Sequence, residues 1–195
     1  MSQAIEEPTY AVVRQIGDQI ELRRYAAYAV AEVRLDATAT ATATDADAGN
    51  QAFPILAGYI FGKNKGQRTL EMTAPVTQSA EPVTLAMTAP VTQGAVAGGM
   101  RVQFVLPKDV TLATAPEPEP LDPQVRLREA QPAQRAVIRY TGSGSQANCD
   151  EHLGKPQAAL AAAGIATEGE PVLARDNGPM TPWFMRRNEI WLALR

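Results

Sequence analysis

The sequence predicts an α+β fold in which two helices pack on a curved antiparallel sheet. Several segments alternate apolar and polar residues with the period of two that a half-buried strand shows. Two other segments repeat apolar residues at helical spacing. Along the sequence, the order strands, helix, strands occurs twice. The connections between successive strands are too short for the crossovers of a parallel sheet. The pattern indicates two similar halves within a single domain of 195 residues.

The N-terminal third predicts three strands, at 9–16, 20–25 and 28–35. A Gly-Asp pair, typical of a turn, separates the first two strands. The low-complexity segment 36–49 follows and contains almost no large side chains. Because it has little apolar surface to bury, we expect an exposed connection there.

Helical spacing first occurs in residues 50–66, where Asn50 is the expected N-cap and Gly62 the expected end. The apolar stripe of this helix consists of Phe53, Leu56, Ala57 and Ile60. A second helix is expected within 145–165, with Gly164 as its terminator.

The phrase Met-Thr-Ala-Pro-Val-Thr-Gln occurs twice, beginning at Met72 and at Met87. A turn around 79–82 would make an antiparallel hairpin of 70–78 and 83–91. We interpret the repeat as a duplicated strand segment. Further strands are expected at 100–107, 125–130, 135–140, 170–175 and 186–195.

Composition excludes several classes of function. The formal charge of −3, the pI near 5.3 and the lack of a basic run argue against a nucleic-acid-binding protein. The chain contains no apolar run that could span a membrane and no secretion signal at its start. The single cysteine, Cys149, cannot form an internal disulfide. We therefore expect a cytoplasmic protein. The common metal, phosphate-loop and nucleophile motifs are also absent from the sequence.

Two phrases are specific in combination: AGYIFGKNKG followed by LEMTAPVTQ, and MTPWFMRRNEIWLAL near the end. With VQFVLP and PEPEPLDPQVRL between them, they resemble the SOUL family of haem-binding proteins in its bacterial form, from about Tyr10 to Leu194. The resemblance implies a distorted antiparallel β-barrel of two pseudo-equivalent halves, each with a helix. It also implies that haem b or a related porphyrin binds in an apolar groove beside the first helix and the loop before the last strand.

For that groove, the candidate contacts are Ala57, Ile60, Phe61, Met180, Trp183, Phe184 and Arg186. Ile60 has an alternative place in the core stripe of its helix. Met180, Trp183 and Phe184, three large apolar residues of one expected loop, have an alternative role as a plug at one end of the barrel. Lys63 or Lys65 could take the place of Arg186 as the cation that meets the propionates.

Two more residues carry candidate chemistry. His152, the only histidine, is the candidate axial ligand to the iron, and an exposed structural histidine is the alternative. Glu189 could act as a general base in a dry pocket. The alternative for Glu189 is an Arg–Glu pair that fixes the strand register.

The leading hypothesis is a non-enzymatic protein that binds, carries or buffers a tetrapyrrole or another flat hydrophobic small molecule. Gyrase-inhibitor-like ligand-binding domains share the architecture that the resemblance implies, so the fold leaves other functions open. One alternative is a small-molecule hydrolase or haem-modifying enzyme that uses Glu189. Another is a ligand-sensing module that acts through a protein partner.

Overall fold

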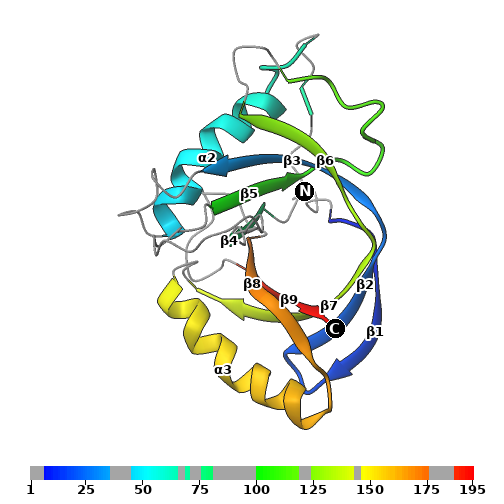
Figure 1. Ribbon diagram of the computed structural model, residues 1–195, viewed down its shortest axis with the longest axis vertical. Helices are drawn as coiled ribbons and strands as arrows, with labels where there is room; N and C mark the ends of the chain where they lie inside the picture. The colour runs from blue at the N-terminus through cyan, green and yellow to red at the C-terminus, as the bar shows by residue number, and fades with distance from the viewer. Residues whose placement is uncertain are drawn as a thin grey trace, which may run out of the picture.

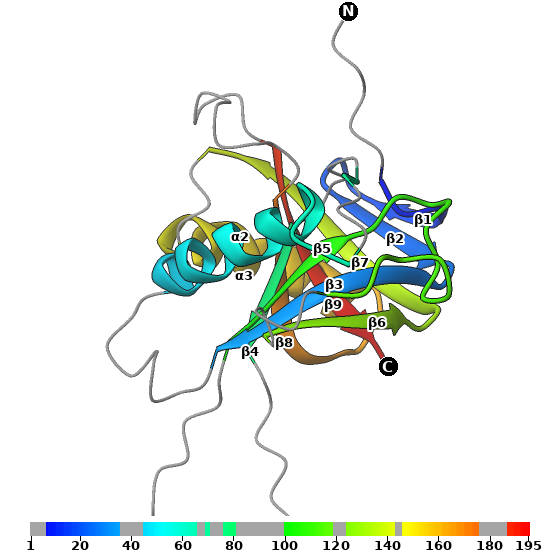
Figure 2. The same ribbon diagram turned by 90° about the horizontal axis from the view of Figure 1, so that it is seen from above.

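The computed structural model describes residues 7–35, 45–65, 69–70, 76–80, 100–118, 124–142, 146–175 and 187–195. These residues form one nine-stranded sheet, in which every pairing is antiparallel, and two helices on its outside (Figures 1 and 2). The mixed α+β class predicted from the sequence is confirmed. No helix in the described part of the chain is long and apolar enough to cross a membrane.

Three of the predicted strands have the bounds that the structure shows, at 20–25, 28–35 and 125–130. The strands are β1 (Tyr10–Ile16), β2 (Ile20–Tyr25), β3 (Tyr28–Leu35), β4 (Val76–Ala80), β5 (Met100–Val105), β6 (Val125–Ala130), β7 (Ala133–Thr141), β8 (Thr167–Arg175) and β9 (Arg187–Leu194). The helices are α2 (Asp45–Ile60) and α3 (Gln146–Ala162).

The first helix begins at Asp45, five residues before the expected N-cap Asn50. The end of the segment expected as a loop therefore belongs to the helix, since its alanines are strong helix formers. Both helix ends lie where the glycines predicted them: Gly62 has φ 109° and Gly164 has φ 72°, a region that side chains other than glycine rarely adopt.

The strand order is β1-β2-β7-β9-β8-β4-β5-β3-β6. After β1, this order contains two sets of four strands. The first set is β2-β7-β9-β8, and the second set, which follows it in the sheet, is β4-β5-β3-β6. A helix joins β7 to β8 in the first set and β3 to β4 in the second. Only Ala26 and Ala27 separate β2 from β3, so one long, bent strand passes from the first set to the second.

The predicted closed barrel is wrong. A barrel requires its two end strands to share a hydrogen-bonded ladder. Among the strands that the structure describes, β1 pairs only with β2 and β6 only with β3, so the curved sheet that they form is open. The two sets are joined instead by the continuous β2–β3 strand and by the contact of β4 with β8.

The hairpin predicted from the doubled phrase is also wrong for residues 76–78. In β4 these residues pair with β5 on one side and with β8 on the other, so no edge remains for 83–91. The second copy of the phrase lies outside the described residues.

Each helix covers its own core. Leu56, Tyr59 and Ile60 of α2 pack on β3 and β5, and the rings of Phe53 and Phe104 meet edge-on at 5.2 Å. The core under α3 contains Leu160 of that helix and residues of β2, β7, β8 and β9. A third, smaller cluster fills the opposite face of the sheet, made of Tyr25, Val137, Ala174 and Trp191.

Candidate functional site

Glu189 lies in the middle of β9, on the face of the sheet opposite to α3. Its neighbours Ile190 and Leu192 point into the core under α3, so the strand alternation turns Glu189 and Trp191 to the other face. The Glu189 side chain is 2% exposed. Arg23 donates from Nη2 to Oε1 at 3.0 Å and from Nη1 to Oε2 at 3.1 Å, a bidentate pair. Trp191 Nε1 donates to Oε2 at 2.8 Å.

More charged groups surround this pair. Arg187 Nη2 donates to Glu189 Oε1 at 3.0 Å, and Arg139 Nε reaches the same oxygen at 3.4 Å. Glu21 accepts from Arg23 Nε at 2.7 Å, and Glu7 lies 3.2 Å from Arg187 Nη1. We call this group the inner ion cluster; its members are Glu7, Glu21, Arg23, Arg139, Arg187 and Glu189. Three arginines face three glutamates, so its formal charges balance.

The electrostatics of Glu189 oppose a role as general base. Burial alone would raise the pKa of Glu189, but the charge of Arg23 and the hydrogen bonds from Trp191, Arg23 and Arg187 outweigh burial and hold the pKa below its usual range. A general base works best with a pKa near the working pH and with a lone pair that faces substrate. Glu189 has neither feature, and its contacts fit the structural alternative.

Sequence reasoning did not single out Arg23, which the structure places at the centre of this cluster. The residue is 1% exposed although it occupies a polar position of an amphipathic strand. Its guanidinium stacks 4.2 Å from the centre of the Tyr10 ring. The available signal was the pairing of Glu21 and Arg23 with the aromatic Tyr25 on one face of β2. That face looks solvated in the sequence, because the side chains that bury Arg23, among them Glu189 of β9 and Tyr10 of β1, come from other strands of the same sheet.

The end of α2 offers a different kind of site. Phe61 is 60% exposed, more than any other large apolar residue that the structure describes. Ala57 lies one turn earlier and is half-buried, and Gly58 beside it has no side chain. Ile60, another predicted contact, is fully buried under the helix and offers no surface to a ligand. We call Ala57, Gly58 and Phe61, together with Lys63, the α2 shelf.

Lys63 is the cation of the α2 shelf. A Cβ on Gly58 would stand 3.1 Å from Lys63 Cδ, so the lysine stem lies over the glycine. Lys65 pairs with Glu117 on the far side of the turn. Lys63, by contrast, makes no ion pair with any residue in the described part of the chain.

The turn that carries Lys63 is held in place by its neighbours. Lys63 N donates to Gly58 O at 2.9 Å, and Asn64 Nδ2 donates to Tyr59 O at 2.8 Å. The Tyr59 hydroxyl in turn donates to Pro116 O at 2.7 Å. The α2 shelf is therefore fixed to the segment that precedes β6.

The remaining predicted site residues fall into two groups. Met180, Trp183, Phe184 and Arg186 lie outside the described residues. His152 lies on α3, not α2, where its half-buried ring packs on Tyr140 with 5.0 Å between the ring centres.

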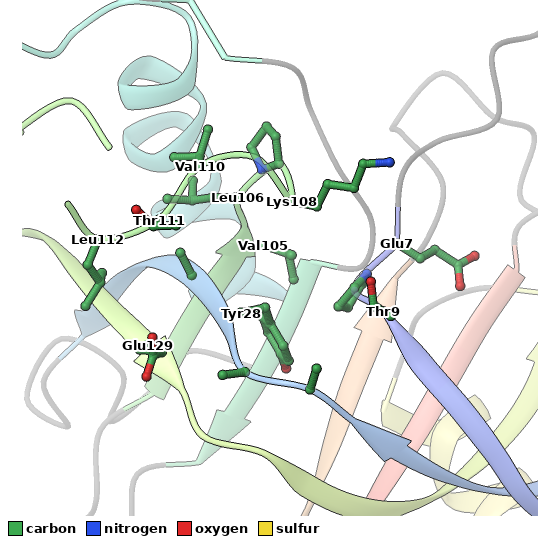
Figure 3. A pocket seen from close by; sticks show the side chains of 15 residues that line it. Glu7, Thr9, Tyr28, Val105, Leu106, Lys108, Val110, Thr111, Leu112 and Glu129 are labelled. Carbon is green, nitrogen blue, oxygen red and sulfur yellow. The ribbon is translucent and has the colours of Figure 1, made fainter. Parts of the chain in front are cut away.

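A cavity of about 170 Å³ lies elsewhere, near the start of β3 (Figure 3). Its walls come from the segment Glu7–Thr9, the β2–β3 junction and the loop after β5. Pockets that enclose drug-sized ligands measure roughly 300–1,000 Å³. This cavity is smaller than that range, so it does not suit a tetrapyrrole.

Comparison with protein families gives one match over nearly the whole chain. The model of the family described as SOUL heme-binding protein matches residues 5–193. None of the curated proteins matches the sequence.

Solved structures show the same fold at low sequence identity. An uncharacterized conserved protein from Listeria innocua superposes with a TM-score of 0.60 at 9% identity, covering 91% of this chain and 92% of the other. A hydrolase from Listeria innocua gives 0.56 at 10% identity, covering 91% and 92%. The C-terminal domain of EcmrR gives 0.56 at 10% identity, covering 91% and 97%. At these identities the likeness concerns the fold alone.

Proposed function

The chain belongs to the SOUL heme-binding protein family, and on this premise we propose that it binds haem b or a related tetrapyrrole and carries or buffers it without converting it. The site proposed is the α2 shelf together with Met180, Trp183, Phe184 and Arg186 of the loop before β9.

The exposure of Phe61 carries this proposal. A phenyl ring that is 60% exposed leaves apolar surface in water, and a large side chain of this kind gains about 1.5–3 kcal/mol when it is fully buried. Ala57 and Gly58 keep the neighbouring surface low, so a flat macrocycle can lie across all three residues. Stacking of the macrocycle on Phe61 would bury the ring and orient the ligand.

The charges of the α2 shelf suit the acidic edge of haem. Lys63 lies over Gly58 and supports a propionate by ion pairing, and Arg186 is the second proposed cation. Bound haem would supply an iron centre for electron or small-ligand chemistry. The chain supplies the apolar surface, the cations and the exclusion of water from one face of the macrocycle.

Axial ligation is a separate question from binding. His152 is the only histidine, and its ring is already packed on Tyr140 of β7. We propose that apolar contact carries most of the affinity and that His152 is the candidate ligand to be tested apart from it. A hydrolase that uses Glu189 is disfavoured, because the inner ion cluster occupies that carboxylate on both oxygens.

The test is a titration of hemin into the purified protein, followed in the Soret region. We expect a saturable shift that weakens in Phe61→Ser and in Trp183→Ala. Val12→Ser is the matched control, since Val12 is also exposed, at 52%, but lies on β1. A titration without a saturable shift would overturn the proposal. His152→Ala separates ligation from binding, because it alters the band position only if the imidazole holds the iron.

A further inference from the structure

An open groove lies on the sheet where β6, the strand at one end, runs beside β3 (Figure 1). Its volume is about 550 Å³, within the roughly 300–1,000 Å³ of small-molecule sites. None of its lining residues belongs to the α2 shelf or to the inner ion cluster. We call it the arginine groove; it is lined by Glu32, Arg34, Pro118, Val125, Arg126, Leu127 and Arg128.

The strand register gathers arginines on one face of β3, β5 and β6. Arg126 stands opposite Glu32, and Arg101 of β5 stands opposite Arg34. Arg128 follows Arg126 by two residues, so the strand alternation turns it to the same face. Glu32 is the only carboxylate on this face of these three strands, as far as the structure describes them. Like charges directly opposite each other destabilise a sheet, so an anion on this face would relieve repulsion.

Glu32 lies beneath the arginines and draws two of them together. Its side chain is 0% exposed, whereas the side chains of Arg34 and Arg128 are 36% and 51% exposed. Arg34 Nε donates to Glu32 Oε1 at 3.1 Å, and Arg128 Nη1 lies 3.5 Å from the same oxygen. The other oxygen, Oε2, accepts from Gln103 Nε2 at 2.9 Å. One buried carboxylate thus holds two guanidinium groups close to one point, and both arginines keep exposed surface.

Arg126 adds a further cation to the groove. It is exposed and makes no ion pair with any residue in the described part of the chain. Among the lining residues, the single charge of Glu32 offsets one of three arginines, which leaves two positive charges in excess. A guanidinium carries five N–H donors, more than one contact with a carboxylate uses. The groove therefore combines excess positive charge with donors that can meet an anion.

Charge and convergence together narrow the ligand class. Two excess positive charges match a dianion. Because Arg34 and Arg128 meet at one oxygen, the negative charge of the ligand should be concentrated at one centre, as in a phosphate group, and arginine forks match phosphate oxygens in pairs. The wall beside the arginines supplies Pro118, Val125 and Leu127, on which a small apolar group can pack. We propose that the arginine groove is a second binding site, for a phosphate monoester with a small apolar or aromatic group.

Three aromatic probes test the proposal by calorimetric titration of the intact protein at about pH 8. Phenyl phosphate is a dianion there, since the second pKa of a phosphate monoester is about 6. Phenyl sulfate has the same shape with one charge, and terephthalate has its two charges at opposite ends. We expect saturable binding of phenyl phosphate, about tenfold or more tighter than binding of either other probe, because only phenyl phosphate places two charges at the point where the arginines meet.

Variants then place the ligand. Arg126→Gln and Arg128→Gln should each weaken phenyl phosphate binding about tenfold, since each removes a charged donor. Arg24→Gln, which alters an exposed arginine of β2, is the matched control and should have no effect. Cooperative urea denaturation of all three variants shows that a loss of binding is not a loss of the fold.

The inference is overturned if phenyl phosphate does not bind saturably, or if Arg126→Gln and Arg128→Gln bind it as tightly as the wild type. Equal affinity for phenyl phosphate and phenyl sulfate would overturn the assignment of a dianion, and equal affinity for terephthalate would overturn the single centre of charge. Phenyl phosphate binding that is kept in Phe61→Ser, while hemin binding is weakened, shows that the arginine groove and the α2 shelf are independent sites.

Discussion

The inner ion cluster and the α2 shelf differ in how their chemistry is exposed. The cluster gathers six charged residues on the sheet face opposite α3, and its central groups, Arg23 and Glu189, are almost fully buried. The α2 shelf has one exposed ring, a glycine without a side chain and one lysine. The site with many functional groups is thus closed, and the site with few is open to solvent.

This difference shows what the charged groups on β2 and β9 do. Each acceptor oxygen of Glu189 already receives a short hydrogen bond, so the carboxylate has little capacity left for a substrate. The α2 shelf leaves an apolar ring in water, which is unfavourable for the free protein and favourable for association. We therefore expect the α2 shelf, whose apolar ring lacks packing contacts, to bind a ligand. We expect the inner ion cluster, whose groups are already hydrogen-bonded, to stabilise the fold.

The largest effect should come from breaking the inner ion cluster. Glu189→Gln removes the bidentate carboxylate partner of buried Arg23 and leaves Glu21 as its remaining carboxylate. Removal of one member of a buried pair costs about 3–5 kcal/mol of the free energy of unfolding, and we expect a loss approaching that range. Urea denaturation measures the loss. Glu168→Gln, which changes an exposed pair with Arg195, should cost at most about 0.5 kcal/mol. Equal stability of the two variants would contradict the structural role of the cluster.

Acid should weaken the same cluster. The pKa of Glu189 is lower in the folded chain than its ordinary value of 4.5, so the ionised carboxylate stabilises the fold. That contribution is complete above about pH 4.5 and is lost as the pH falls towards the lower folded-state pKa. Denaturation at a series of pH values measures the decline. In Glu189→Gln the part of the decline that this carboxylate causes should be missing; an unchanged profile would exclude Glu189 as its source.

A substitution on the α2 shelf should lower the affinity for hemin and leave the stability of the fold nearly unchanged, the opposite of a substitution in the inner ion cluster. Phe61→Ser should weaken hemin binding about tenfold, since partial burial of a phenyl ring contributes on the order of 1–2 kcal/mol. The free energy of unfolding should change by less than about 0.5 kcal/mol, because the ring packs little in the free protein. Parallel hemin titrations and urea denaturation separate the two quantities. A large loss of stability would place Phe61 in the core, contrary to its exposure.

Much of the fold could be predicted from sequence periodicity. The bounds of β2, β3 and β6 follow from alternation, because each has one face on a core. Gly62 and Gly164 marked both helix ends. The pairing of β4 could not be predicted, since Thr, Val and Gln fit an inner strand between β5 and β8 as well as a local hairpin. The prediction of a closed barrel was wrong for a related reason, because alternation shows which face of a strand is buried but not which strand edges pair.

The candidate site was only partly predictable. Helical spacing placed Ala57 and Phe61 at the edge of the stripe, and the structure leaves Phe61 exposed and Ala57 half-buried. Arg23 could not be found in this way, because its burial depends on β7 and β9, far along the chain. The cavity beside Glu7 was equally hidden, since its walls join residues near the N-terminus to the loop after β5.

The smallest expected effect concerns the charge of Lys63 on the α2 shelf. It tests whether a charge on this exposed site contributes to ligand binding, as charges contribute to stability in the inner ion cluster. Lys63→Met should weaken hemin binding by a few-fold at low salt, since an exposed ion pair contributes about 0–1 kcal/mol. The difference between variant and wild type should disappear near 1 M salt, where the screening length falls to about 3 Å. Lys65→Met is the matched control, because Lys65 is paired with Glu117.

A porphyrin whose propionates are esterified carries no negative charge for Lys63 to meet. Its affinity should therefore be equal in the wild type and in Lys63→Met, while Phe61→Ser still lowers it. If Lys63→Met weakened the ester and the acid alike, the lysine would act through its methylene stem over Gly58 and not through its charge. The α2 shelf would then act as a purely apolar surface, whereas the inner ion cluster acts through its charges.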